Sequence, residues 1–140
     1  MFTASCLCRA VQFNIHGELA PIQVCHCGKC RKAQGGPIVT VIPVNESAIE
    51  WIAGRESLKA FESSPGKERV FCANCGAPVF SRRTGQSDGQ PGVLRIRAGL
   101  IDGDLPVQPV SHAFVGEACN WWPIDDELPK YDGARPAGAP

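Results

Sequence analysis

The sequence predicts an all-β domain made of several small antiparallel sheets, with little helix. Three observations predict it. Apolar residues recur at every second position in short segments, Gly, Pro, Asn and Asp separate these segments, and seven cysteines form tight clusters that could staple the fold through zinc. The chain has 140 residues, of which 44% are hydrophobic. That length suits one domain, and the apolar content suffices for a core.

The strands are expected at intervals along the whole chain. Val11, Phe13 and Ile15 alternate with polar residues, as in a half-buried strand. Residues 37–42 form a largely apolar run rich in β-branched side chains, which is typical of a more buried strand. Further short strands are expected at residues 49–52, 58–61, 69–72, 79–81, 93–98 and 112–115.

Few segments favour helix or loop over strand. Residues 30–34 are expected to form a short helix, because Gly35-Gly36 follows as a stop signal and basic residues stand near its end. Residues 82–92 are polar and predict a loop. We expect a single domain over residues 1–132 and a flexible tail over residues 133–140, which are rich in Gly, Ala and Pro.

Charge and hydropathy exclude several classes of partner. The 14 basic residues balance 14 acidic ones, so the chain lacks the broad basic field that nucleic-acid binding requires. No apolar run approaches the roughly 20 residues that cross a bilayer. The first residues, MFTASCLCRAVQF, lack the charged region and long apolar core of a secretory signal. We expect a soluble, cytoplasmic protein with no nucleic-acid partner and no membrane association.

Eight cysteines carry most of the functional information. They stand in three clusters and one isolated position: Cys6 and Cys8; Cys25, Cys27 and Cys30; Cys72 and Cys75; and Cys119. A disulfide framework needs an oxidising compartment, and this cysteine content is below the roughly 8 to 10% typical of disulfide scaffolds. We interpret the clusters as metal ligands, with redox chemistry at one of the pairs as the alternative.

Two of the clusters predict a closed four-sulfur site. In FCANCG, Cys72 and Cys75 flank the tight turn of a zinc knuckle, and Gly76 tolerates the positive φ that often follows. Cys6-Leu7-Cys8 is expected to lie in an extended strand, whose alternate side chains share a face, so that both sulfurs can approach one ion. The four cysteines together predict a structural zinc with Zn–S bonds of about 2.3 Å.

The remaining cluster supplies three ligands and leaves its fourth undetermined. Cys25, Cys27 and Cys30 can converge where a strand ends in a turn. His26 stands between two cysteines of one face, so it is expected to point to the opposite face and not to bind the metal. Cys119 or His112 would close the site, whereas a catalytic zinc keeps a place for water or substrate. The spacing allows both.

The motifs taken together resemble a known enzyme family. The segments CLCRAVQF, CHCGKCRKAQGG, FCANCGAPVF, AGLIDGDLPVQPVSHAFV and WWPIDDELPKYD are similar, in this order, to those of the glutathione-dependent formaldehyde-activating enzyme family. The resemblance spans residues 5 to about 132. Arg9 and the sequence Ala118-Cys119-Asn120 depart from the family pattern. The same domain occurs in centromere protein V.

This resemblance implies a fold, a metal content and an activity. The fold is a β-tent of coiled antiparallel sheets, with a structural zinc at Cys6, Cys8, Cys72 and Cys75. A second, catalytic zinc is implied at Cys25, Cys27 and Cys30, so the chain would carry two zinc ions. The implied activity is that of a carbon–sulfur lyase, an S-(hydroxymethyl)glutathione synthase, which adds the thiol of glutathione to formaldehyde.

Other side chains are candidates for the substrate site, each with a structural alternative. Cations could meet the carboxylates of glutathione or be surface charge, aromatic residues could wall the site or fill the core, and carboxylates could shuttle protons or stand in turns. The cations are Lys29, Arg31, Lys32, Arg95 and Arg97; the aromatic residues are Trp51, Phe114, Trp121 and Trp122; the carboxylates are Asp102, Asp104, Asp125 and Asp126.

Two other functional classes compete with the enzyme hypothesis. In a zinc scaffold that binds another protein, both sites would be closed and Cys119 would be the eighth ligand. In a redox enzyme, Cys119 or one cysteine of a CxxC pair would react with peroxide or disulfide. The oligomeric state and the contacts to glutathione are left open by the sequence.

Overall fold

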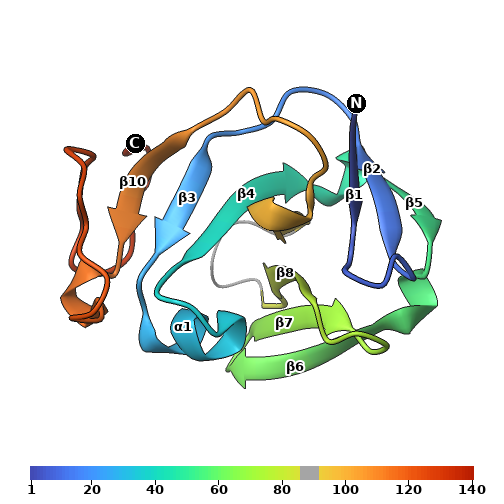
Figure 1. Cartoon of the computed structure of the whole chain (residues 1–140), viewed down its shortest axis with the longest axis horizontal. Coiled ribbons are helices and arrows are strands. Elements are labelled where there is room, and N and C mark those ends of the chain that lie inside the picture. Colours follow the sequence, from blue (N-terminus) through green and yellow to red (C-terminus); the bar gives the residue numbers. More distant parts are fainter. Residues whose placement is uncertain (86–91) are drawn as a thin grey trace.

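The computed structural model describes residues 1–85 and 92–140 (Figure 1). Within these ranges the strands are β1 (Phe2–Ser5), β2 (Gln12–Ile15), β3 (Ile22–Cys25), β4 (Val39–Asn45), β5 (Ile49–Ala53), β6 (Leu58–Ser64), β7 (Lys67–Cys72), β8 (Pro78–Arg83), β9 (Val93–Arg97) and β10 (Pro109–Ala113). The helical segments are α1 (Gly28–Gln34) and the 3-10 turns η1 (Glu46–Ala48), η2 (Arg55–Ser57), η4 (Ala98–Leu100) and η5 (Val115–Glu117). The prediction of an all-β fold with little helix is confirmed.

The described strands form two sheets. One has three strands in the order β1-β2-β5, and the other has seven in the order β10-β3-β4-β9-β8-β7-β6. Neighbouring strands are antiparallel except β10 and β3, which are parallel. In Figure 1 the larger sheet curves from β10 through β4 to β6, so its two ends lie on different sides of the molecule. None of the described helices is long and apolar enough to cross a bilayer.

The core lies between the inner faces of the two sheets. Phe13 and Ile15 on β2 are buried against Ile42 on β4 and Ile96 on β9, because alternate residues of each strand face the same side. The ring centroids of Phe13 and Trp51 are 5.2 Å apart, and Trp51 also lies 6.2 Å from the ring of Phe80. Trp51 is therefore a partly buried residue that packs against this core.

Three local predictions differ from the structure. Cys6, Leu7 and Cys8 do not form a strand; they lie in a turn after β1, where the Arg9 N–H donates to the Cys6 carbonyl at 3.1 Å and Arg9 takes a φ of 64°. Helix α1 begins at Gly28, two residues earlier than expected, since Cys27 caps it. Strand β10 ends at Ala113, because Phe114 has a φ of 56° and leaves the extended conformation.

The boundary predictions concern the two least regular parts of the chain. Residues 86–91 of the expected polar loop lie outside the described residues. The division at residue 132 stays a prediction, although residues beyond it contact the domain: the Phe114 N–H donates to the Gly133 carbonyl at 2.8 Å, and Tyr131 Oη donates to the Pro140 carbonyl at 3.2 Å.

Candidate metal centres

Four sulfurs from the two sheets meet in one cluster. Cys6 and Cys8 follow β1 of the smaller sheet, while Cys72 and Cys75 flank the turn between β7 and β8 of the larger one. All four Sγ atoms lie within 4.8 Å of one another, with 3.6 Å from Cys6 to Cys8 and 3.9 Å from Cys8 to Cys72. A tetrahedron with bonds of about 2.3 Å has edges of about 3.8 Å. The cluster therefore has the donors and the spacing of a zinc site.

Neighbouring amides prepare these sulfurs for metal binding. The Val11 N–H donates to Cys6 Sγ at 3.3 Å, and Asn74 Nδ2 donates to Cys8 Sγ at 3.1 Å. The Asn74 contact is the main reason why the pKa of Cys8 falls to about 6, whereas burial raises the pKa of Cys6 to about 11. Gly76 has a φ of 78°, as the knuckle requires. Amide donors of this kind stabilise thiolates.

Three further sulfurs converge where β3 leads into α1. Cys25 is the last residue of β3, Cys27 is the N-cap of α1, and Cys30 lies in the first turn. Cys27 Sγ accepts a hydrogen bond from the Cys30 backbone N–H at 3.3 Å, a capping role that Ser or Asp usually fills. The three Sγ atoms lie within 4.8 Å of one another, and no other His, Cys, Asp or Glu in the described ranges joins the group.

Arg69 and a shared proton give this cluster anionic character. The Nη1 and Nη2 atoms of Arg69, on β7, lie 3.7 and 3.8 Å from Cys30 Sγ. A hydrogen bond from the Cys25 thiol lowers the pKa of Cys30 to about 5, with Arg69 also contributing. The same hydrogen bond raises the pKa of Cys25. These contacts favour the thiolate form of Cys30, the form that binds metal.

A cavity of about 330 Å³ lies beside Cys25 and Cys30. Its described lining includes no Asp or Glu, whereas six cationic residues contribute to it: Lys67, Arg69, Arg83, Arg95, Arg97 and Arg135. Five of the six come from β7, β8 and β9, whose alternate side chains share a face. A concave site lined by one sign of charge attracts ligands of the opposite sign. This cavity suits an anion that also reaches the sulfurs.

Beside a separate cavity, of about 460 Å³, the buried His26 belongs to a chain of hydrogen bonds that ends at the exposed Asp126. His26 Nε2 lies 2.8 Å from His112 Nδ1, and His112 Nε2 lies 2.8 Å from Asp126 Oδ2. A neutral His112 that donates to the carboxylate accepts from the Nε2–H of His26, which fixes both tautomers. Burial lowers the pKa of His26, and the contact with His112 lowers the pKa of Asp126.

The C-terminal part of the chain holds the loop that carries the three cysteines. Glu117 accepts a hydrogen bond from the Gly28 N–H through Oε1 at 3.2 Å, and its carbonyl accepts from Arg31 Nη1. Arg31 Nη1 also donates to the His26 carbonyl at 2.9 Å, while the His26 N–H donates to the Ala113 carbonyl at 3.0 Å. The backbone between Cys25 and Cys30 is therefore fixed at both of its sides.

Comparison with known proteins identifies the family. The model of the glutathione-dependent formaldehyde-activating enzyme family matches residues 1–117. The chain belongs to this family. Both sulfur clusters, together with β1 to β10 and α1, lie within the matched residues. The expected family membership is thereby confirmed.

Individual relatives are more distant. An uncharacterised lyase of Schizosaccharomyces pombe is 27% identical over 79 residues, covering 56% of each chain. A protein of Pyrenophora teres f. teres, provisionally named a glutathione-dependent formaldehyde-activating enzyme, is 29% identical over 77 residues, which cover 55% of this chain and 40% of the relative. The matches thus span about half the length of these relatives.

A solved structure shares the fold. The crystal structure of a Rhodobacter sphaeroides protein superposes with a TM-score of 0.60 at 20% identity, covering 76% of this chain and 98% of the other. At this identity the likeness concerns the arrangement of strands alone. It shows that the two-sheet architecture of this family member also occurs in a crystallised protein.

The two candidates for a fourth ligand lie outside the three-sulfur cluster of this family member. His112 uses both ring nitrogens, one toward His26 and one toward Asp126. Cys119 does not belong to either sulfur group. His26 turns away from the sulfurs into its contact with His112, as the alternation of side chains predicted. The cluster of Cys25, Cys27 and Cys30 therefore offers three protein donors within the described residues.

The other predicted site residues are divided between the two cavities and the surface. Arg95, Arg97 and Phe114 line the cavity beside the sulfurs, whereas Arg31 is bound to backbone carbonyls and the described lining does not include Lys29 or Lys32. The cavity beside His112 is lined by Trp122 and Asp125 together with Asp126, and Trp121 is 62% exposed. Asp102 accepts a hydrogen bond from Thr3 Oγ1, and Asp104 is exposed.

Sequence analysis missed the two cations nearest to Cys30 on β7, Lys67 and Arg69. A signal for them exists: they stand two residues apart in the strand that leads to the Cys72 knuckle, so they share one face. That this face looks toward Cys30 depends on the pairing of β7 with β8 and β9. The hydrogen-bonded chain from His26 to Asp126 was missed for the same reason, because it joins residues 86 and 14 positions apart.

Proposed function

We propose that this protein is a carbon–sulfur lyase of the S-(hydroxymethyl)glutathione synthase type, which joins a small thiol to formaldehyde or a related aldehyde. Glutathione is the first candidate for the thiol. The observation that carries the proposal is the three-sulfur cluster, which opens onto a cavity with a cationic lining. Family membership and the name given to the fungal relative support the choice of glutathione and formaldehyde.

In this proposal the chain binds two zinc ions. Cys6, Cys8, Cys72 and Cys75 hold a structural ion that joins the two sheets, and their spacing supports a closed tetrahedral site. Cys25, Cys27 and Cys30 hold the catalytic ion. A zinc ion held by these three cysteines would favour the thiolate form of a bound thiol by lowering its pKa.

The reaction needs one carbon–sulfur bond and the relocation of one proton. The thiol sulfur attacks the carbonyl carbon and the π electron pair moves to the oxygen. The sulfur loses its proton, and the oxygen gains one to become a hydroxyl group. A free thiol with a pKa of about 8.5 is only slightly ionised at neutral pH, so activation of the sulfur is the main task of the site.

The residues of the chain have separate tasks in this scheme. Arg69 stabilises the thiolate form of Cys30, and the amide cap on Cys27 fixes its sulfur at the start of α1. The contacts of Arg31 and Glu117 keep the loop in place while the fourth ligand exchanges. The cations on β7 to β9 attract the carboxylates of an anionic thiol.

The test is the rate of S-(hydroxymethyl)glutathione formation with glutathione and formaldehyde at several protein concentrations. Thiols add to formaldehyde without a catalyst, so the background rate is measured in parallel. We expect a rate that exceeds this background, increases with protein concentration and disappears in Cys27→Ser. Cys119→Ser is the matched control, because it removes a thiol outside both clusters. Glutathione binding without rate enhancement would contradict the lyase proposal and favour a carrier.

A further inference from the structure

Arg97 is a buried cation with no carboxylate partner among the described residues. It lies at the end of β9 and is only 3% exposed. Its Nη1 donates to the Arg95 carbonyl at 3.4 Å, which is a long hydrogen bond, and its Nε has no hydrogen-bond partner within the described part of the chain. No carboxylate in residues 1–85 and 92–140 forms an ion pair with Arg97. Burial of an unpaired charge is costly unless a ligand compensates for it.

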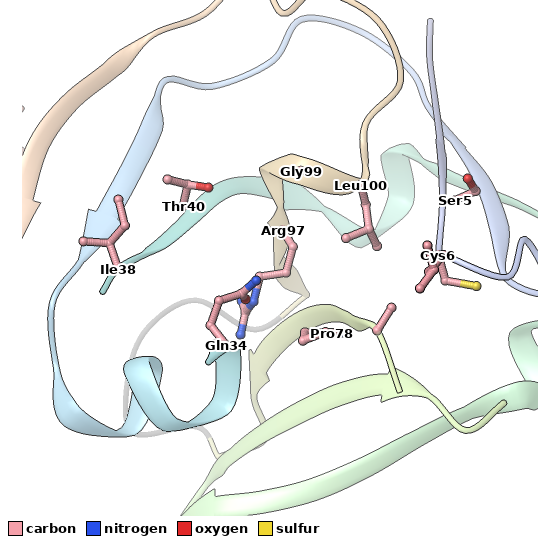
Figure 2. A pocket seen from close by; sticks show the side chains of 11 residues that line it. Ser5, Cys6, Gln34, Ile38, Thr40, Pro78, Arg97, Gly99 and Leu100 are labelled. Carbon is pink, nitrogen blue, oxygen red and sulfur yellow. The ribbon is translucent and has the colours of Figure 1, made fainter. Parts of the chain in front are cut away.

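The Arg97 side chain lies in a cavity, where a ligand could reach it. Figure 2 shows it extending from β9 toward Gln34, at the end of α1, in a cavity of about 530 Å³. Ile38, Pro78 and Leu100 give this cavity apolar walls, and its described lining contains no acidic residue. Arg97 also lines the cavity beside Cys25 and Cys30. The Arg97 guanidinium therefore borders both this cavity and the cavity beside Cys25 and Cys30.

The sulfur cluster does not account for Arg97. Both terminal nitrogens of Arg69 already contact Cys30 Sγ, at 3.7 and 3.8 Å, whereas no hydrogen bond among the described residues joins Arg97 to a sulfur. Burial lowers the pKa of Arg97 and the positive charge of Arg69 lowers it further, so the folded protein gives this cation an unfavourable environment. The sulfurs Cys30 and Cys25 compensate for only part of that effect.

We propose that Arg97 binds a carboxylate of the thiol substrate, so that the site selects thiols that carry a carboxylate over neutral thiols of similar size. The inference rests on the proposed function, because it assigns the anionic end of the same substrate. Guanidinium and carboxylate form paired, charge-assisted hydrogen bonds, and the unpartnered Nε is one of the donors suited to such a pair. The ligand supplies the carboxylate partner that Arg97 does not find among the described residues.

Binding is tested first with a probe that cannot react. S-methylglutathione has both carboxylates of glutathione and no free thiol, and its diethyl ester has neither carboxylate. Isothermal titration of the zinc-loaded protein should show that S-methylglutathione binds and that its diethyl ester binds with much lower affinity. Arg97→Gln should lower the affinity for S-methylglutathione by about tenfold or more. The affinity of Arg97→Lys should lie between those of the wild type and Arg97→Gln, because Lys keeps the charge and loses the paired donors of the guanidinium.

Two further variants separate recognition from structure. Arg55→Gln removes an exposed cation that lies over the Trp51 ring, and it should bind S-methylglutathione like the wild type. Arg97→Met removes the unpaired charge at similar length, so it should raise the melting temperature of the ligand-free protein and retain both zinc ions. Loss of zinc from Arg97→Met would overturn the proposal, because Arg97 would then be a counter-charge of the sulfurs.

Selectivity supplies the second readout. With formaldehyde, the wild type should prefer 3-mercaptopropionate to 2-mercaptoethanol in kcat/KM, and Arg97→Gln should lose this preference mainly through KM. Equal affinity of wild type and Arg97→Gln for S-methylglutathione would overturn the carboxylate assignment. Catalysis with equal kcat/KM for thiols with and without a carboxylate would refute this inference and leave the proposed function standing. Carboxylate binding at Arg97 without catalysis would support this inference and contradict the proposed function.

Discussion

Replacement of Cys72 by Ser should remove most of the stability of the fold. Cys72 has no exposed surface and ends β7 in the larger sheet, while its cluster partners Cys6 and Cys8 follow β1 in the smaller sheet. Structural zinc sites of this kind contribute about 10 to 16 kcal/mol in zinc-finger peptides. The whole stability of a domain is about 5 to 15 kcal/mol. The loss of a zinc ion from this cluster would therefore be enough to unfold the protein.

The magnitude separates the metal effect from a packing effect. A hydroxyl left without a partner in the core costs about 1 to 3 kcal/mol by itself, so a loss confined to that range would mean that no metal was involved. Urea unfolding followed by circular dichroism, with zinc content measured on the same samples, distinguishes the two. We expect Cys72→Ser to resemble wild-type protein treated with a strong chelator. A cooperative transition at the wild-type urea midpoint would refute the structural zinc.

Three other predictions follow from the same geometry. Cys119→Ser should retain two zinc equivalents by elemental analysis. Cys27→Ser should retain one equivalent and keep its fold. A loss of zinc from Cys119→Ser would favour a scaffold protein in which Cys119 closes the second zinc site. Asp126→Asn should weaken the dependence of stability on pH at the acidic side. The folded state lowers the pKa of Asp126, so the unfolded chain takes up the proton first and this contribution is lost as the pH falls below the ordinary carboxyl pKa. Urea midpoints of equal slope against pH in both proteins would contradict that role.

Spacing alone predicted how the cysteines are grouped. The CxxC turn brings the sulfurs of Cys72 and Cys75 together in almost any fold, and the alternate positions of Cys6 and Cys8 predicted that these two supply the other ligands. The extended conformation predicted at Cys6 was wrong, because a turn closed by the Arg9 N–H also brings the sulfurs of Cys6 and Cys8 together. Two cysteines two positions apart can bind one metal ion from either a turn or a strand, and the sequence does not distinguish the two conformations.

The long-range contacts could not be predicted in the same way. Arg69 meets Cys30 only because β7 and α1 lie close in the folded chain, and the sequence separation of 39 residues contains no sign of this. Arg97 was expected as one of several surface or substrate cations, but its burial depends on how η4 and β4 pack around the end of β9. His112 was weighed as a ligand, and its actual partners, His26 and Asp126, are brought to it by the parallel pairing of β10 with β3 and by the C-terminal segment.

In the proposed two-zinc protein, the fourth ligand of the ion at Cys25, Cys27 and Cys30 tests the central claim most directly. X-ray absorption at the zinc edge counts the sulfurs around both ions. Seven cysteine ligands shared by two ions give an average of about 3.5 sulfurs per zinc in the thiol-free protein, and the average should rise to about 4 when glutathione is added. Cys119→Ser should give the same two values. An average of 4 before any thiol is added, falling in Cys119→Ser, would contradict the account, as would a value of 3.5 that glutathione leaves unchanged.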